Sequence, residues 1–135
     1  LKAAKTAKTD TIGDASSKAA RPVKDKWALV VGISNFSNAD INLKFAAKDA
    51  TDFANFLIKD ANFSQDHVKL LTDQAAGRDN IIKQLGDGWL GRRAAADDLV
   101  VVYISSHGSA AKNEAGGVNF LVAHDTEPDA LLSTG

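Results

Sequence analysis

The residues best placed for chemistry are Ser105, Ser106, His107 and Gly108, which directly follow an apolar segment. Residues 99–104 are apolar and rich in β-branched side chains, as expected of a fully buried parallel strand. In open α/β sheets, ligands bind outside the carboxyl ends of the strands. His107 therefore stands where a general acid or base would act, and Gly108 would let the backbone approach a substrate closely. The simpler alternative is a surface histidine at a strand end.

Hydrophobic periodicity predicts the elements that must position this strand. Continuous or alternating apolar runs predict strands, and apolar residues recurring every three or four positions predict helices. The predicted strands are residues 27–33, 67–71 and 118–122, and the predicted helices are residues 43–59 and 78–90. Strand, helix, strand, helix, strand is typical of a parallel sheet with right-handed crossovers, so we expect the α/β class.

Glycine-rich phosphate loops are not indicated. Gly32 follows the first predicted strand, but the G-x-G-x-x-G spacing and a following Lys-Ser/Thr pair are missing. Gly86 and Gly88 lie inside the second helical pattern, which they weaken. The sequence therefore argues against nucleotide binding.

The composition of the chain limits the other classes of protein to which it could belong. The chain has 135 residues, enough for one domain, and a formal net charge of -1, so no global field favours nucleic acid. No apolar run approaches the length of a membrane span. Cysteine is absent and three histidines are scattered, which excludes disulfides, thiolate metal sites and a histidine metal motif. The compartment stays open between cytoplasmic and exported.

Residues 1–25 differ in composition from residues 26–135. Residues 1–26 hold seven of the 16 Lys and Arg residues but three of the 17 Asp and Glu residues. This segment has almost no large apolar residues, so burial would not offset its ordering entropy. We expect a flexible or draped arm, followed by the folded domain. The start at Leu1 suggests a processed or trimmed N-terminus.

Four motifs in order resemble the caspase-like cysteine peptidases, and among them metacaspases and bacterial orthocaspases more than animal caspases. They are residues 27–33, 46–50, 70–73 and 97–108. The resemblance covers residues 26–135. It implies a large, p20-like catalytic subunit folded as a three-layer sandwich, with a mainly parallel central sheet and flanking helices.

The resemblance also implies roles for individual residues. His107 would be the general base or acid of a Cys-His pair, and the backbone N–H of Gly108 would belong to the oxyanion hole. Asp49 and Ser105 would line a primary pocket for Arg or Lys before the scissile bond. A carboxylate in a partly dry pocket holds a guanidinium well, which agrees with this assignment.

One departure from the family is the nucleophile, because the chain has no cysteine. In caspases the cysteine follows the histidine by about 50 residues. Counted from His107, that position lies beyond Gly135. We therefore expect a p10-like subunit or a C-terminal segment to carry the cysteine, together with a second acidic pocket residue. Neither Ser105 nor Ser106 would replace it, and the chain alone should not hydrolyse peptides.

Two other classes of function remain open. One is a catalytically inactive caspase-like interaction or regulatory module. A following sequence with an apolar strand ending in Asp-x-Cys would exclude it. The other is a non-peptidase hydrolase that uses His107 with Ser106, which requires this serine to be the sole reactive nucleophile. The expected partner is a peptide or protein substrate.

The resemblance requires no cofactor, although calcium activates some metacaspases. Asp125, Glu127 and Asp129 are acidic residues close together in the sequence and are candidates for binding calcium, but solvated carboxylates are the simpler interpretation.

The other polar residues have structural interpretations. We expect Asp52 to be a solvated helix residue, with a role in the pocket as the alternative, and His67 to be structural. We expect His124 on the same sheet edge as His107, at the surface, with a position lining the cleft as the alternative. Asp97 and Asp98 are expected to end the preceding segment and begin the strand.

Overall fold

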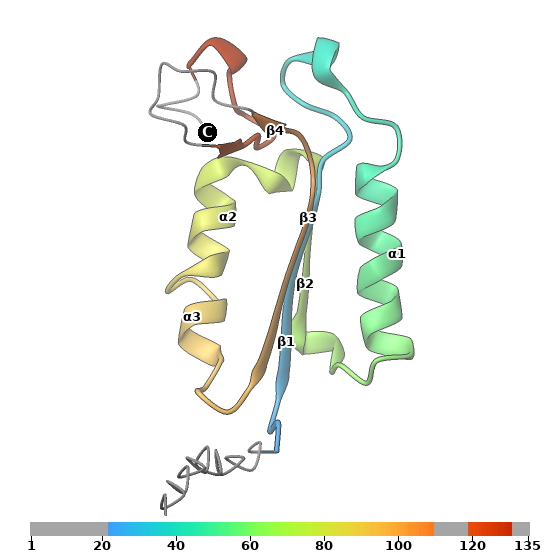
Figure 1. Ribbon diagram of the computed structural model, residues 1–135, viewed down its shortest axis with the longest axis vertical. Coiled ribbons are helices and arrows are strands. Elements are labelled where there is room, and N and C mark those ends of the chain that lie inside the picture. The colour runs from blue at the N-terminus through green and yellow to red at the C-terminus, as the bar shows by residue number, and fades with distance from the viewer. Residues whose placement is uncertain (1–21, 110–118, 131–135) are drawn as a thin grey trace, which may run out of the picture.

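The computed structural model describes residues 22–109 and 119–130. Three strands form a parallel sheet in the order β2-β1-β3, with α1 on one face and α2 and α3 on the other (Figure 1). The α/β class and the layered arrangement are therefore confirmed. The elements are β1 (Lys26–Gly32), α1 (Ala46–Lys59), β2 (Val68–Thr72), α2 (Arg78–Leu85), α3 (Leu90–Arg93) and β3 (Leu99–Ser105).

Shorter elements surround the carboxyl ends of these strands. Strands β4 (Gly108–Ser109) and β5 (Phe120–Leu121) pair antiparallel in a separate two-stranded sheet. The described residues also include short 3₁₀ helices. They are η1 (Ala39–Ile41), η2 (Gln65–His67), η3 (Asp73–Ala76) and η4 (Pro128–Ala130).

The structure shortens the predicted fourth strand, residues 118–122. Of its described residues, Phe120 and Leu121 form a strand, which pairs with Gly108–Ser109 and not with the three-stranded sheet. A parallel strand needs a crossover of a dozen or more residues, whereas an antiparallel partner is reached by a shorter return. Because β4 ends at Ser109 and β5 begins at Phe120, too few residues separate them for such a crossover, which explains the antiparallel pairing.

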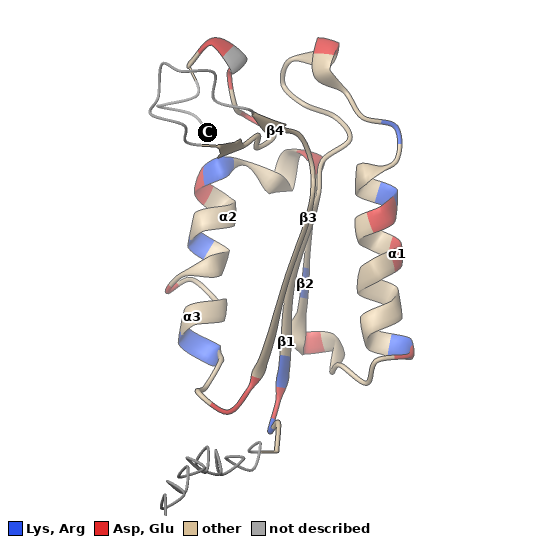
Figure 2. Cartoon of the chain, in the orientation of Figure 1, with Lys and Arg blue, Asp and Glu red and all other residues tan. Residues whose placement is uncertain are grey.

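Strand β1 lies in the middle of the sheet and is buried on both faces. Leu29 and Val31 pack with residues of β2, α2 and α3, while Ala28 and Val30 pack with α1. Burial on both faces is the reason why the strand has a continuous apolar run rather than an alternating pattern. Charged residues gather on the helices and at the ends of the strands (Figure 2).

Gly32 lets the first turn of α1 lie directly against the end of β1. A Cβ atom at this position would overlap the carbonyl oxygen of Ala46 and the Cβ atom of Ala50. Ala46, Ala50, Ala54 and Leu57 are the buried residues of α1, in agreement with its predicted apolar face. The helix begins at Ala46 and not at residue 43, because the N–H of Leu43 donates to the carbonyl of Ser34 in the preceding loop.

The second predicted helix, residues 78–90, is divided. Helix α2 ends at Leu85, and Gly86 caps it by donating its N–H to the carbonyl of Ile82. A Cβ atom on Gly88 would overlap the carbonyl oxygen of Lys83, so this tight connection to α3 requires glycine. The two glycines end the helix rather than merely weaken it.

Strand β3 is not fully buried, which corrects the sequence-based prediction. Among the described residues it is an edge strand, and Val100 and Val102 are 42% and 46% exposed. Val101 and Tyr103 pack on the side of α1, whereas α2 and α3 contact β1 and β2. One edge and one apolar face of β3 are therefore open in this part of the chain. No helix in the described ranges is long and apolar enough to cross a membrane.

Candidate active site

The carboxyl ends of β1, β2 and β3 bring three loops together at one edge of the sheet (Figure 1). Gly32, Thr72 and Ser105 are in register at this edge. This edge is where ligands bind in open α/β sheets. The residues expected to carry chemistry all lie in or beside these loops.

His107 is half-buried, and its orientation is fixed by the loop that follows β1. Its Nε2 atom lies 2.7 Å from the carbonyl oxygen of Ile41. A carbonyl oxygen accepts hydrogen bonds and cannot donate, so in the neutral imidazole Nε2 carries the proton and Nδ1 keeps the lone pair. The ring of Phe36 packs on the imidazole, with centroids 5.4 Å apart. Nδ1 is therefore the nitrogen of His107 suited to act as a base.

No residue pattern indicates Ile41, because its contribution is a backbone carbonyl that any residue type provides. The 3₁₀ turn η1 presents this carbonyl, and Asn38 begins the turn by accepting a hydrogen bond from the N–H of Asp40. Asn42 then holds the loop by accepting from the N–H of Phe36 at 2.8 Å. The two asparagines are local turn signals, but they do not indicate which carbonyl meets the histidine.

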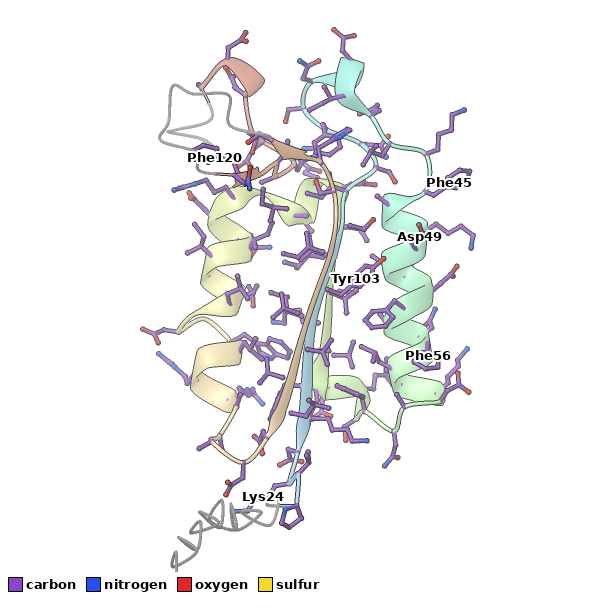
Figure 3. All side chains as sticks on the ribbon, in the orientation of Figure 1. Lys24, Phe45, Asp49, Phe56, Tyr103 and Phe120 are labelled. Atoms are coloured by element: carbon purple, nitrogen blue, oxygen red, sulfur yellow. The ribbon has the colours of Figure 1, made fainter. Side chains whose placement is uncertain are left out.

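Asp49 and Ser105 lie at the same level of the molecule. Phe53 of α1 stacks on Tyr103 of β3 with centroids 4.6 Å apart. Asp49 lies one turn before Phe53, and Ser105 lies two residues after Tyr103. Helix α1 runs antiparallel to β3 (Figure 1). Figure 3 shows Tyr103 on the side of β3 facing α1, with Asp49 closer to the carboxyl ends of the strands. The fold thus places this exposed carboxylate and Ser105 toward the same end of α1 and β3, the end at which His107 follows β3.

Gly108 has an open environment. It pairs with Leu121, and the N–H of Val122 donates to the carbonyl of His107. In an antiparallel ladder, this pattern turns the N–H groups of Gly108 and Leu121 away from each other. A Cβ atom on Gly108 would lie 3.9 Å from the nearest atom, the carbonyl oxygen of Phe120. No internal contact of the described residues therefore requires glycine at this position.

Ser106 does not contact the imidazole. Its hydroxyl donates to the carbonyl oxygen of Val122 at 2.6 Å, while His107 Nε2 is bonded to Ile41. A serine nucleophile requires a hydrogen bond to its base. The structure therefore gives no geometric support to a hydrolase that uses Ser106 with His107.

Asp73 is the best-connected carboxylate at this edge. Its Oδ1 accepts from the backbone N–H groups of Ser34 and Asn35, each at 2.8 Å, and its Oδ2 accepts from Asn35 Nδ2 at 3.0 Å. Partial burial acts to raise the pKa of Asp73, but these hydrogen bonds and the nearby His124 outweigh it and lower the pKa below its ordinary value. The carboxylate is therefore ionised at neutral pH.

The acidic segment after β5 is held by specific bonds. Asp125 Oδ1 accepts from the N–H of Arg78 at 2.8 Å and so caps α2. Asp125, Glu127 and Asp129 border an open hollow of about 500 Å³. Within residues 22–109 and 119–130, no three His, Asp or Glu side chains converge to hold a metal ion.

The remaining polar residues have structural contacts. His124 is half-buried rather than free at the surface, and its Nδ1 lies 2.7 Å from the carbonyl oxygen of Asn35. His67 stacks on Trp27 with centroids 3.6 Å apart, as expected of a structural residue. Asp52 pairs with Lys48 on the exposed side of α1. Asp98 accepts from Trp27 Nε1 at 3.0 Å and fixes the start of β3.

This fold and this arrangement around a strand-end histidine define the class. The chain belongs to the caspase domain family of C14 peptidases, which it matches over residues 25–133. It is similar to metacaspase-1 of Debaryomyces hansenii and to metacaspase-1 of Meyerozyma guilliermondii, with 32% identity over 97 residues in each case. These matches cover 67% of this chain but 21% and 23% of the two relatives. The resemblance to metacaspase-type peptidases is thereby confirmed, and the chain spans about a fifth of the length of these curated relatives.

Proposed function

We propose that the chain is the large-subunit part of a caspase-like cysteine endopeptidase. The observation that carries this proposal is the bond from His107 Nε2 to the carbonyl of Ile41, which leaves Nδ1 free to accept a proton. Membership of the caspase domain family supports the same chemistry. The substrate is a peptide or protein, and the mechanism uses no cofactor.

His107 and Gly108 have separate roles in this mechanism. His107 Nδ1 takes the proton of a cysteine thiol, and the imidazolium later gives a proton to the leaving amine. The Gly108 N–H, which points away from β5, donates to the oxyanion of the tetrahedral intermediate. The carbonyl of Ile41 accepts from Nε2 in both the neutral and the protonated ring, so the imidazole keeps its orientation throughout.

The cysteine comes from a following segment that pairs with the open edge of β3. An edge strand presents unpaired backbone N–H and C=O groups to another strand. Val100, Val102 and Ile104 are 42%, 46% and 36% exposed along this strand, a pattern suited to burial beneath additional chain. A cysteine at the carboxyl end of such a strand would lie beside His107.

The primary pocket of this proposal accepts Arg or Lys. Asp49 is exposed and lies at the level of Ser105, and Ser105 precedes His107 by two residues. A carboxylate binds a guanidinium through charge-assisted hydrogen bonds, and the hydroxyl of Ser105 supplies a further acceptor. The second acidic residue of the pocket belongs to the segment that carries the cysteine.

The absence of cysteine from this chain favours one alternative, a catalytically inactive interaction or regulatory module. The two functions differ in whether the protein that carries the chain reacts with a peptide electrophile. An inactive module would bind partners without forming a covalent adduct.

The experiment compares this chain alone with the protein that includes the segment following it. Each is incubated with fluorogenic peptides that differ only in Arg, Lys or Asp before the scissile bond, and with a peptidyl chloromethyl ketone ending in Arg. We expect hydrolysis and a cysteine adduct, located by mass spectrometry, in the longer protein alone. Hydrolysis by this chain alone, or an adduct on Ser106, would contradict the proposal. The absence of any reaction in a cysteine-containing protein would favour the inactive module.

A further inference from the structure

We infer that Asp73 is a positioning residue for His107, which acts by fixing the β1–α1 loop that contacts the imidazole. This inference rests on the proposed function, because it takes His107 as the catalytic base. The Asp73 carboxylate bonds to Ser34 and Asn35, at the start of the loop that contacts the imidazole, and not to the imidazole itself. Its effect on catalysis is therefore indirect.

The backbone at Asp73 has an unusual conformation. Its φ is 47°, in the left-handed region that side chains other than glycine seldom adopt. This residue follows directly on β2, whose last residue, Thr72, is in register with Gly32. The turn lets the carboxylate reach across to the residues just after β1. Strained positions of this kind concentrate at functional sites.

The carboxylate of Asp73 satisfies three donors at the beginning of the loop. They are the N–H groups of Ser34 and Asn35 and the side-chain amide of Asn35. Two backbone N–H groups bonded to one oxygen fix the direction in which the chain leaves β1. Because the acceptor is charged, these bonds are stronger than those between neutral groups.

The β1–α1 loop is also hydrogen-bonded at its end near α1, so both ends of the loop are fixed. The Ser34 hydroxyl accepts from the N–H of Ala47 at 2.9 Å, and the Ser34 carbonyl accepts from the N–H of Leu43 at 2.8 Å. Ser34 thus joins the Asp73 carboxylate to the start of α1. Phe36 and Ile41, which contact His107, lie between these two attachment points.

A purely structural role for Asp73 would change stability without changing the state of His107. The two roles are separated by ¹⁵N NMR of the histidine side chains, which reports which imidazole nitrogen carries the proton. The spectrum is recorded at a pH where His107 is neutral, in the protein that carries this chain. The readout does not depend on peptide hydrolysis, so it remains informative even if the proposed function fails.

The main variant is Asp73→Asn. Its amide oxygen still accepts from the two backbone N–H groups, but its NH₂ now faces the NH₂ of Asn35. Asp79→Asn on α2 is the matched control, since the Asp79 side chain is 94% exposed. We expect Asp73→Asn to shift His107 from one tautomer toward a mixture and to lower kcat about 10- to 100-fold with little change in KM. The control should change neither quantity.

A second substitution tests for rescue. In the double variant Asn35→Asp with Asp73→Asn, the introduced amide can donate to the introduced carboxylate while still accepting from both backbone N–H groups. We expect the double variant to recover the single His107 tautomer and most of kcat. Asn35→Asp alone places two carboxylates together and should be the most disturbed of the set.

If Asp73→Asn folds, three results would overturn the inference. One is an unchanged His107 tautomer and kcat in folded Asp73→Asn. Another is equal effects in Asp73→Asn and Asp79→Asn, and the third is a double variant no better than Asp73→Asn. If Asp73→Asn does not fold, Asn35→Ala removes one side-chain donor and leaves both backbone bonds. It must then shift the His107 tautomer in the same direction, and an unchanged tautomer would refute the inference. A wild-type protein with one fixed tautomer but no hydrolysis would refute the proposed function alone.

Discussion

His107 Nε2 and the carbonyl oxygen of Ile41 lie 2.7 Å apart, although 66 residues separate them in the chain. The orienting partner of the imidazole is thus a backbone carbonyl rather than a carboxylate side chain. Its position depends on the conformation of the β1–α1 loop. Residues that hold this loop therefore control the histidine, even where they do not touch it.

Replacing His107 should abolish turnover without unfolding the protein. In the cysteine-containing protein, we expect His107→Ala to lower kcat/KM by more than about 10²–10⁴-fold, because thiolate activation is lost together with acid–base assistance. His67→Gln is the control, since His67 lies near the amino end of β2 and stacks on Trp27. Peptide hydrolysis measures the effect, and circular dichroism checks the fold. Near-normal turnover in His107→Ala would refute the role of His107 as the catalytic base.

Asp49 should determine the preference for basic substrates. We expect Asp49→Asn to lower kcat/KM for peptides with Arg before the scissile bond by about 10-fold or more, since a charge-assisted hydrogen bond is lost. Asp52→Asn, one turn later on α1, is the matched control because Asp52 pairs with Lys48. Parallel assays with Arg and Asp peptides measure the change. Equal losses in both variants, or a wild-type preference for Asp, would refute the assignment of the pocket.

The sequence indicated the sheet and the histidine because both depend on local patterns. Residues 27–33 and 99–104 are apolar for longer than a surface strand would be, and His107 follows the second run. The motifs that resemble the caspase family added Asp49, Ser105 and Gly108. These five features can be predicted without knowing which residues, far apart in the sequence, are in contact in the fold.

The remaining features depend on tertiary contacts that a pattern does not encode. The Ile41 carbonyl has no sequence signature, and the role of Asp73 appears only when β2 lies beside β1. Strand β3 was predicted to be buried because its residues are apolar and β-branched. In the described part of the chain, however, only one face of this strand is covered, and Val100 and Val102 are exposed. The helix predicted from residue 78 onward was too long because the glycines at its end form a tight connection.

Gly32 should be intolerant of any side chain. The Cβ atom of Gly32→Ala would overlap backbone and Cβ atoms of α1, which have no flexible end to move aside. We expect a loss of about 1–3 kcal/mol in the free energy of unfolding, the usual effect of overpacking a core. Urea unfolding gives the value. A stability equal to that of the wild type would mean that α1 can move away from β1 without cost.

Gly108→Ala is expected to behave in the opposite way. The added methyl meets no atom closer than 3.9 Å, so the free energy of unfolding should change by no more than about 0.5 kcal/mol. Because the methyl would lie on the residue whose N–H is proposed to bind the oxyanion, and would hinder a close approach of substrate, kcat/KM should fall on the order of 10- to 100-fold. Urea unfolding and peptide hydrolysis on one preparation separate the two effects. Full activity would show that substrate does not approach Gly108 closely.

Protonation of Asp73 should lower the free energy of unfolding in acid. Its folded-state pKa lies below the ordinary value of 3.8, since the hydrogen bonds from Ser34 and Asn35 outweigh the effect of burial. Between these two pKa values the unfolded chain binds more protons than the folded chain, so stability rises with pH in this interval. The contribution of Asp73 is fully present above the ordinary pKa and is lost as the pH falls through the lower, folded-state pKa.

The measurement is urea unfolding of the wild type and Asp73→Asn from pH 7 to pH 2.5. We expect a constant difference in the free energy of unfolding above about pH 5 and a shrinking difference below about pH 4. Asp98→Asn should show the same trend, because bonds from Ala95, Trp27 and Asp25 lower the pKa of Asp98 as well. Asp79→Asn controls for the general effect of removing one negative charge. A wild type and Asp73→Asn with parallel pH profiles would show that the Asp73 carboxylate is not bonded in solution as it is in the structure.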